Sequence, residues 1–268
     1  MTSTSGRPTS ALARPRPRRG TARPLLVIAF WIGVWQIAAL VVGQQILLAA
    51  PTDVLVRLTE LVVTGPFWAT VAHSFARIAA GFTLAAVVGV LGAAAAARLR
   101  VVDALVTPLL AAVRATPVVS FIILVIMWAG SARLALVISF LMVLPIVYTT
   151  VLAGIRNRDA QLLEVAAVFR MPLRRRLPAI DVPAVLPYFI AACQVGLGLA
   201  WKSGIAAEVI GLPSGSIGEQ LYQAKLYISS PDLFAWTVVI ITVAFAFEKA
   251  VLVLLARAER AITHGRAS

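Results

Sequence analysis

The sequence predicts an all-α, polytopic membrane protein of about six transmembrane helices. Three observations lead to this fold class. Hydrophobic residues make up 60% of the 268 residues, charged residues only 13%, and the mean hydropathy is +0.93. The apolar residues come in blocks of roughly 20, the length of helix that crosses about 30 Å of hydrocarbon. Basic residues stand at the ends of these blocks, so membrane topology explains the net charge of +13, and no nucleic-acid partner is expected.

Six apolar blocks are long enough to span a bilayer as tilted helices. The third block contains Arg114 and Pro117, so we expect a helix kinked at the proline with the arginine near a membrane surface. The predicted spans are Leu25 to Gly43, Phe75 to Ala97, Leu105 to Ala129, Leu134 to Gly154, Leu186 to Ile210 and Phe234 to Ala256.

The first block could be a retained span or the apolar region of a cleaved signal peptide. Ala49 and Ala50 would supply small residues for cleavage. However, the block is longer than the usual apolar region of a signal peptide and contains Trp31 and Trp35. We therefore favour a retained span.

The distribution of Lys and Arg between the loops predicts the orientation of the chain. Both terminal segments and two connections carry most of the arginines, so this side is expected to be cytoplasmic and the number of spans even. The loops on the other side contain only Arg57, Arg133 and Lys225. We predict a disordered basic cytoplasmic tail over residues 1–24, a transmembrane domain over 25–256 and a cytoplasmic tail over 257–268.

Two segments on the predicted outer side have helical patterns of their own. Pro51 to Val62 indicates a short amphipathic helix. Ser216-Ile217-Gly218-Glu219 is a capping-box pattern that opens another helix, which should end before Pro231. Each helix could contact a partner outside the membrane or simply lie at the membrane interface.

The most polar stretch after the N-terminal tail is the long loop from Ile155 to Pro187 on the predicted cytoplasmic side. Asp159 can cap a short helix in this loop, and Pro172 stops it after about Arg170. A short helix with an apolar face and basic flanks suits a groove of another protein, or else the lipid surface. The residues that share its apolar face are Leu162, Ala166 and Phe169.

This loop resembles the EAA motif of the permeases of binding-protein-dependent ABC importers, which reads E-A-A, three residues, G, nine residues, I-x-L-P. Arg170 stands where the family usually has glycine, and Pro172 could end the helix nearby by pushing Met171 out of helical geometry. The residues that match in register are Glu164, Ala166, Ile180 and Pro183, whereas Val165 and Val182 are conservative departures.

The resemblance covers roughly Phe67 to Arg260 and is closest to the nitrate, sulfonate and taurine branch of these permeases. It implies a multi-pass protein of the bacterial inner membrane with both termini cytoplasmic. The stretches that carry it are Ser74-Phe75-Ala76-Arg77 with Ala80-Gly81-Phe82, Arg114-Ala115-Thr116-Pro117, and Ala200-Trp201-Lys202 with Ala207-Glu208-Val209.

In such importers the EAA helix docks on an ABC ATPase subunit. The resemblance therefore implies two copies of this chain, an ATPase subunit dimer and an extracytoplasmic solute-binding protein. ATP would bind to the partner ATPase, because the chain has no G-x-x-x-x-G-K-[ST] phosphate loop and no cofactor is expected on it. The substrate would be a small anion such as a sulfonate, taurine or nitrate, or alternatively a thiamine-precursor pyrimidine. The ATPase-coupling loop would comprise Leu162, Glu164, Ala166, Phe169, Arg170, Ile180 and Pro183.

Lys202 and Glu208 fall inside the fifth predicted span, where ionisable side chains are costly unless they are paired or hydrated. Both are candidate residues of the translocation pathway, with Lys202 expected to face a cavity. The alternatives are an interfacial Glu208 and a Lys202 that snorkels or pairs with another helix. Gly196 and Gly198 give this span a stripe of small residues, which indicates close helix packing or an unwound pathway segment.

Two other function classes fit the sequence less well. A secondary transporter driven by an ion gradient predicts inverted repeats and several intramembrane acids, and neither is evident. A membrane enzyme predicts a catalytic constellation, yet His73 and His264 lie outside the predicted spans. The single Cys193 provides neither a disulfide within the chain nor a metal-binding spacing. We therefore predict a non-enzymatic permease without catalytic residues or a metal site.

Overall fold

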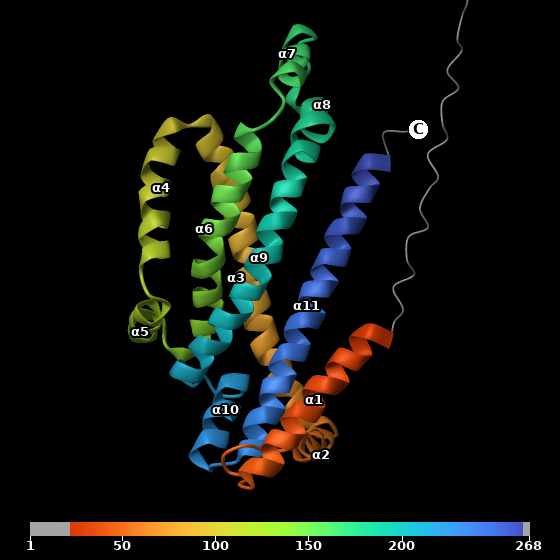
Figure 1. The fold of residues 1–268 in the computed structure, drawn as a ribbon. Coiled ribbons are helices and arrows are strands. Elements are labelled where there is room, and N and C mark those ends of the chain that lie inside the picture. The colour runs from red at the N-terminus through yellow and green to blue at the C-terminus, as the bar shows by residue number, and fades with distance from the viewer. Residues whose placement is uncertain (1–21, 265–268) are drawn as a thin grey trace, which may run out of the picture.

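The computed structural model describes residues 22–264, and over this range the chain forms helices and no strand. Helices are expected, because a helix satisfies its own backbone hydrogen bonds in a solvent that offers none. Figure 1 shows an elongated bundle with α7 and α8 at one end and α2 and α10 at the other. The elements are α1 (Ala22–Val42), α2 (Pro51–Val62), α3 (Gly65–Arg98), α4 (Arg100–Ala115), α5 (Val118–Ala129), η1 (Ser131–Arg133), α6 (Leu134–Arg156), α7 (Ala160–Val168), α8 (Leu173–Arg176), η2 (Leu177–Asp181), α9 (Val182–Gly211), α10 (Ile217–Leu226) and α11 (Ser230–His264).

The chain is a multi-pass membrane protein. Four helical segments are long and apolar enough to cross a membrane. α4 and α5 make a fifth span if they are counted as one broken span. The expected first span falls on α1, whose described apolar part, Leu26–Val42, is shorter. The total of six therefore stays a prediction. The four long segments are Gly65–Arg98, Ser131–Arg156, Leu173–Gly211 and Ser230–Arg260.

The predicted third span, Leu105 to Ala129, is wrong as one kinked helix. α4 and α5 are separate helices bent by 105° relative to each other. Thr116, between them, has extended backbone with ψ 132°, because the ring of Pro117 disfavours helical geometry in the preceding residue. Arg114 lies exposed in the last turn of α4, beside this break.

α3, α6 and α9 form the core of the bundle, with α6 between the other two. Glycines let these helices approach closely. A Cβ atom at Gly81 of α3 would lie 2.4 Å from the carbonyl oxygen of Leu136 in α6, and one at Gly204 of α9 would lie 2.7 Å from Ser139 Oγ. Ser139 Oγ donates a hydrogen bond of 2.9 Å to the carbonyl of Ala200, which joins α6 to α9 inside the membrane.

Polar contacts tie together the end of the bundle that carries α2 and α10. Arg57 of α2 donates to Asp232 of α11 at 2.5 Å and to Glu60 at 2.7 Å, and these hydrogen bonds raise the pKa of Arg57. Both helices predicted here are confirmed. α2 has the expected bounds, and Ser216 Oγ accepts a 3.0 Å hydrogen bond from the N–H of Glu219 where α10 begins.

Other predicted boundaries differ from the structure. The long loop was expected to reach Pro187, but helical structure resumes at Leu173 and continues through the π-turn η2 into α9. Pro183 is the second residue of α9 and directly follows this π-turn, so it lies within continuous helical structure. α11 runs to His264, so the tail predicted from residue 257 is helical as far as it is described. The N-terminal tail up to residue 21 and residues 265–268 lie outside the described part of the chain.

We predict that Gly81→Ala destabilises the bundle by about 1–3 kcal/mol, because the added methyl group meets a backbone carbonyl that cannot rotate away. Gly198→Ala is the matched control, since nothing lies within 4 Å of its Cβ position. Thermal unfolding in detergent measures both variants. A Gly81→Ala variant as stable as Gly198→Ala would contradict the close packing of α3 on α6.

Candidate functional site

α7 stands outside the bundle, beyond the ends of α6 and α9 (Figure 1). Asp159 caps the helix as predicted, because its carboxylate accepts a 2.8 Å hydrogen bond from the N–H of Gln161. Ala166 is the only residue of α7 that is buried. Leu163 is half-buried, so α7 is held by these two side chains and by the two ends of the helix.

The surface of α7 is mostly apolar and exposed. Ala166 is buried, so the predicted face made by Leu162, Ala166 and Phe169 lies only partly against the bundle. Glu164 is exposed and points to roughly the side opposite Ala166, because successive helical residues are about 100° apart. Exposed apolar surface on a short helix outside the membrane spans is typical of a protein-binding segment. The apolar side chains that are 50% to 79% exposed are Leu162, Val165, Val168 and Phe169.

α7 ends in a turn that glycine would normally make. Arg170 has a φ of +46°, in the left-handed region. Its N–H donates to the carbonyl of Ala167 at 3.0 Å, and the N–H of Met171 donates to the carbonyl of Ala166 at 2.8 Å. These two bonds form a Schellman motif. The expectation that Pro172 moves the break to Met171 is wrong, because Arg170 itself adopts the glycine conformation.

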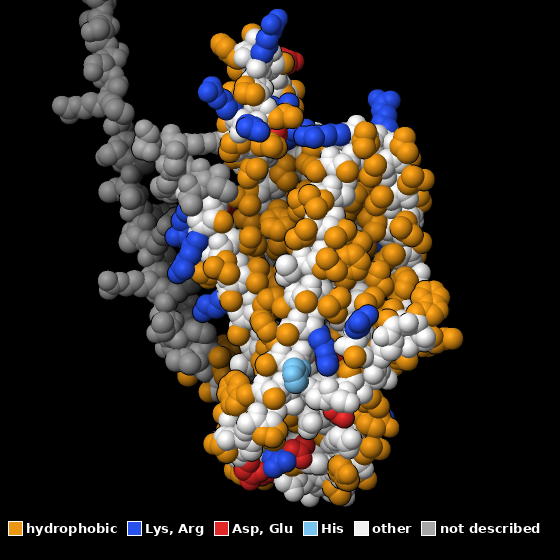
Figure 2. Space-filling view, turned by 180° about the vertical axis from the view of Figure 1, so that it is seen from behind, with side chains coloured by type: hydrophobic (Ala, Val, Ile, Leu, Met, Phe, Trp, Pro, Cys, Tyr) orange, Lys and Arg blue, Asp and Glu red, His pale blue; other side chains and the backbone are white. Residues whose placement is uncertain are grey.

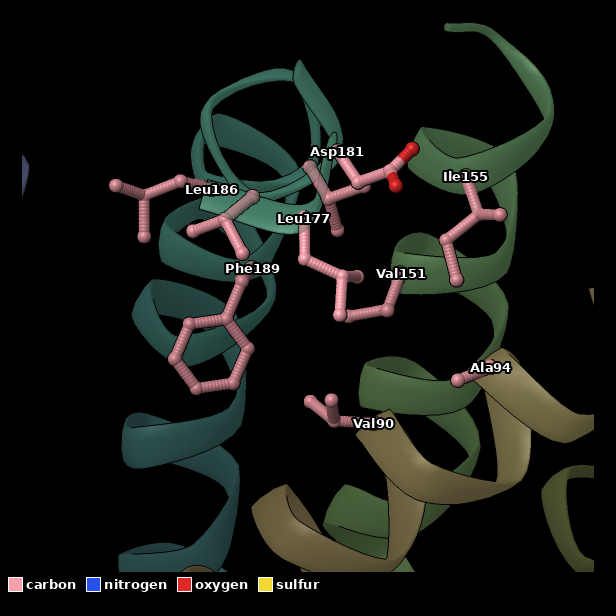
Figure 3. A pocket seen from close by; sticks show the side chains of 10 residues that line it. Val90, Ala94, Val151, Ile155, Leu177, Asp181, Leu186 and Phe189 are labelled. Atoms are coloured by element: carbon pink, nitrogen blue, oxygen red, sulfur yellow. The ribbon is translucent and has the colours of Figure 1, made fainter. Parts of the chain in front are cut away.

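Asp181 fastens the base of the segment that carries α7. Its carboxylate in η2 accepts from the guanidinium groups of Arg158, which precedes α7, and of Arg176 in α8, the latter at 3.0 Å. Arg158 Nε also donates to the carbonyl of Ile155 at the end of α6 at 2.7 Å. Figure 3 shows the carboxylate pointing from η2 toward that end of α6. We call Arg158, Arg176 and Asp181 the base clamp. These residues join both ends of the segment that carries α7.

The sequence analysis missed this role of Asp181, which occupies the variable position of I-x-L-P. Its neighbours Ile180 in η2 and Pro183 in α9 are half-buried, so this part of the motif lies at the base of the loop, whereas Glu164 and Ala166 lie on α7. The sequence did contain a signal for this role of Asp181. Asp181 is a single acid that closely follows Arg174, Arg175 and Arg176, and a buried acid needs basic partners.

The two ionisable candidates in α9 have different surroundings. Glu208 is fully buried, and its Oε2 accepts from Ser74 Oγ at 2.7 Å and from the N–H of Gly218 at 3.3 Å. Arg77 Nη1 lies 4.0 Å from Oε1, which is too far for a hydrogen bond but close enough to balance the charge. Glu208 therefore links α3, α9 and α10 within the protomer. Lys202 is exposed on the surface of α9, where a pathway role stays a prediction.

The two pathway glycines also differ. A Cβ atom at Gly196 would lie 3.1 Å from Val143 of α6, so this glycine serves helix packing. Gly198 has no atom within 4 Å of its Cβ position. α9 is continuous past both residues, and the unwound segment considered from the sequence is absent between Val182 and Gly211.

The described residues bring together no group of three or more His, Cys, Asp and Glu side chains that could hold a metal ion. What the site does present is an exposed apolar helix on a base fixed by ion pairs. This arrangement suits the binding of another protein.

Comparison with known proteins identifies related chains. The family model for the binding-protein-dependent transport system inner membrane component matches residues 85–260. The putative aliphatic sulfonates transport permease protein SsuC of Bacillus subtilis is 29% identical over 84% of this chain and 82% of its own length. The taurine transport system permease protein TauC of Escherichia coli is 24% identical over 85% and 83%. The bicarbonate transport system permease protein CmpB of Synechococcus elongatus is 32% identical over 58% and 55%.

We predict that Arg170→Gly slows amide hydrogen exchange in α7 about two- to five-fold. The left-handed conformation costs a non-glycine residue about 1–2 kcal/mol, and the greater freedom of glycine in the opened state offsets part of that gain. Arg170→Ala, which removes the charge but keeps a Cβ atom, should exchange like the native chain. If the alanine variant were protected as well as the glycine variant, the effect would be one of charge and not of backbone conformation.

Proposed function

Because the chain belongs to the family of binding-protein-dependent transport system inner membrane components, in the nitrate, sulfonate and taurine branch of ABC permeases, we propose that it forms the pathway of an ATP-driven importer. The relatives are transport permeases and not enzymes, and the chain is likewise a transporter subunit. In the proposal, hydrolysis takes place on a separate ABC ATPase subunit, and this chain converts the movement of that subunit into opening and closing of the pathway.

The observation that carries the proposal is α7. A helix with four largely exposed apolar side chains, held at its base by ion pairs, has the form of a segment that lies in a groove of a partner. Docking would bury Val165, Val168 and Phe169. The turn at Arg170 and the base clamp would then transmit a push or pull on α7 to α6 and α9.

The two ends of the bundle support a proposed orientation in the membrane. Arginines gather at the base of the α7 protrusion, above a mainly apolar body (Figure 2), which supports a cytoplasmic location for this end. The opposite end carries α2 and α10 (Figure 1). In the proposal this end faces the extracytoplasmic solute-binding protein.

We place the pathway between two copies of this chain. Within one protomer Glu208 is fully buried and hydrogen-bonded to Ser74. In the proposal it holds the outer end of α9 in place and does not contact the solute. Lys202 is the charged side chain of α9 that remains exposed, and a second copy could enclose it in a hydrated cavity.

The substrate is proposed to be a small anion. The relatives are named for aliphatic sulfonates, taurine and bicarbonate, all of which carry an anionic group. An exposed lysine on the pathway helix would offer such a group a positive charge.

We predict that Phe169→Ser weakens association with the ATPase subunit by about 2 kcal/mol, or roughly thirty-fold, since central apolar anchors dominate such interfaces. Glu164→Lys, a charge reversal on the same helix, should also reduce it. Leu99→Ser is the control, because this exposed leucine lies outside α7. Co-purification with the ATPase and ATP hydrolysis by the reconstituted complex measure the effect. Native-like association of Phe169→Ser and Glu164→Lys would contradict docking through α7.

A further inference from the structure

An apolar hollow lies between the ends of α3, α6 and α9, directly beneath the base clamp. Its volume of about 350 Å³ is within the range of ligand pockets. Figure 3 shows Val90 of α3, Val151 of α6 and Phe189 of α9 converging on it, and Asp181 is the only polar residue among the ten that line it. Ala94 is exposed and Val182 is 41% exposed, so the hollow opens on the surface of the protein.

The mouth of this hollow is basic. A smaller adjoining cavity shares Ala94 and Asp181 with it and is also lined by Arg98, Arg158 and Arg176. Three arginines and one aspartate line this cavity, which leaves an excess of positive charge. Arg98 ends α3, the span that provides one wall, so the arginines lie at the level where the spans leave the hydrocarbon.

The apolar hollow and the arginines beside it together indicate which kind of ligand would fit. A soluble anion would use the charged mouth and leave the apolar hollow empty, whereas a zwitterionic lipid would bring no net charge to the arginines. A membrane lipid with a net negative headgroup matches both parts, because basic pockets between transmembrane helices attract anionic headgroups. We propose that the hollow binds an anionic phospholipid, with an acyl chain between α3, α6 and α9 and the phosphate at Arg98, Arg158 and Arg176. This site is independent of the transported solute.

The experiment titrates the delipidated, full-length protein with dioleoyl phosphatidylglycerol and with dioleoyl phosphatidylcholine and counts bound lipid by native mass spectrometry. We expect the anionic lipid to bind at least about tenfold more tightly than the zwitterionic one. Arg98→Gln should weaken the binding of phosphatidylglycerol about fivefold, the effect of one basic residue near a lipid surface. Arg98 is chosen because it lies outside the base clamp. Arg100→Gln, an exposed arginine that does not line the hollow, should bind like the native chain.

A second pair of variants tests the apolar part. Ala94→Trp fills the hollow and should abolish lipid binding, whereas Leu91→Trp on the lipid-exposed side of α3 should not. Equal binding of both lipids by the native chain would overturn the proposal. So would full competition by glycerol 3-phosphate, which would show an anion site without an acyl chain. If Ala94→Trp failed to fold, Arg98→Gln and the competition would decide the outcome. Association with the ATPase, scored on the same variants, reports separately on the proposed function.

Discussion

The placement of α7 depends on one buried carboxylate. Ala166 is the only fully buried residue of α7 and Leu163 is half-buried, so the position of the helix depends largely on where the chain enters and leaves the segment. Asp181 joins these two places by accepting from Arg158 and Arg176, and Arg158 extends the connection to the end of α6. Removing the carboxylate would leave the guanidinium groups of Arg158 and Arg176, which are 20% and 31% exposed, without their acidic partner. In the proposed mechanism, a force on α7 would reach the spans through Asp181 as well as through the backbone at both ends of the helix.

Buried charges elsewhere in the bundle also need partners, because the bilayer interior offers none. The buried carboxylate of Glu208 is stabilised mainly through Oε2, which accepts hydrogen bonds from Ser74 and Gly218, while Arg77 lies 4.0 Å from Oε1. The same contacts connect α3, α9 and α10 at the end of the bundle that carries α2 and α10. At the end that carries α7, the apolar hollow beneath Asp181 adjoins a cavity lined by three arginines, where we propose that an anionic lipid binds.

Sequence alone predicted the helical fold, the bounds of α2, the cap of α10 and the presence of α7, because apolar blocks and capping side chains act over a few residues. It did not predict the 105° bend at Thr116 or the helical second half of the long loop, since proline permits a break or the start of a helix depending on tertiary contacts. The buried state of Glu208 and the clamp at Asp181 were also missed. Both depend on partners from distant elements that spacing along the chain does not reveal.

The most direct test of the base clamp is a distance measurement by pulsed electron spin resonance between labels at Val168 of α7 and Leu91 of α3, both exposed. We expect a narrow distance distribution in the native chain and a broad one in Asp181→Asn, because α7 then loses the ion pairs that hold its base. Asp159→Asn, which also removes one charge but retains a good helix cap, should keep the narrow distribution. An equally narrow distribution in Asp181→Asn would contradict the role assigned to Asp181.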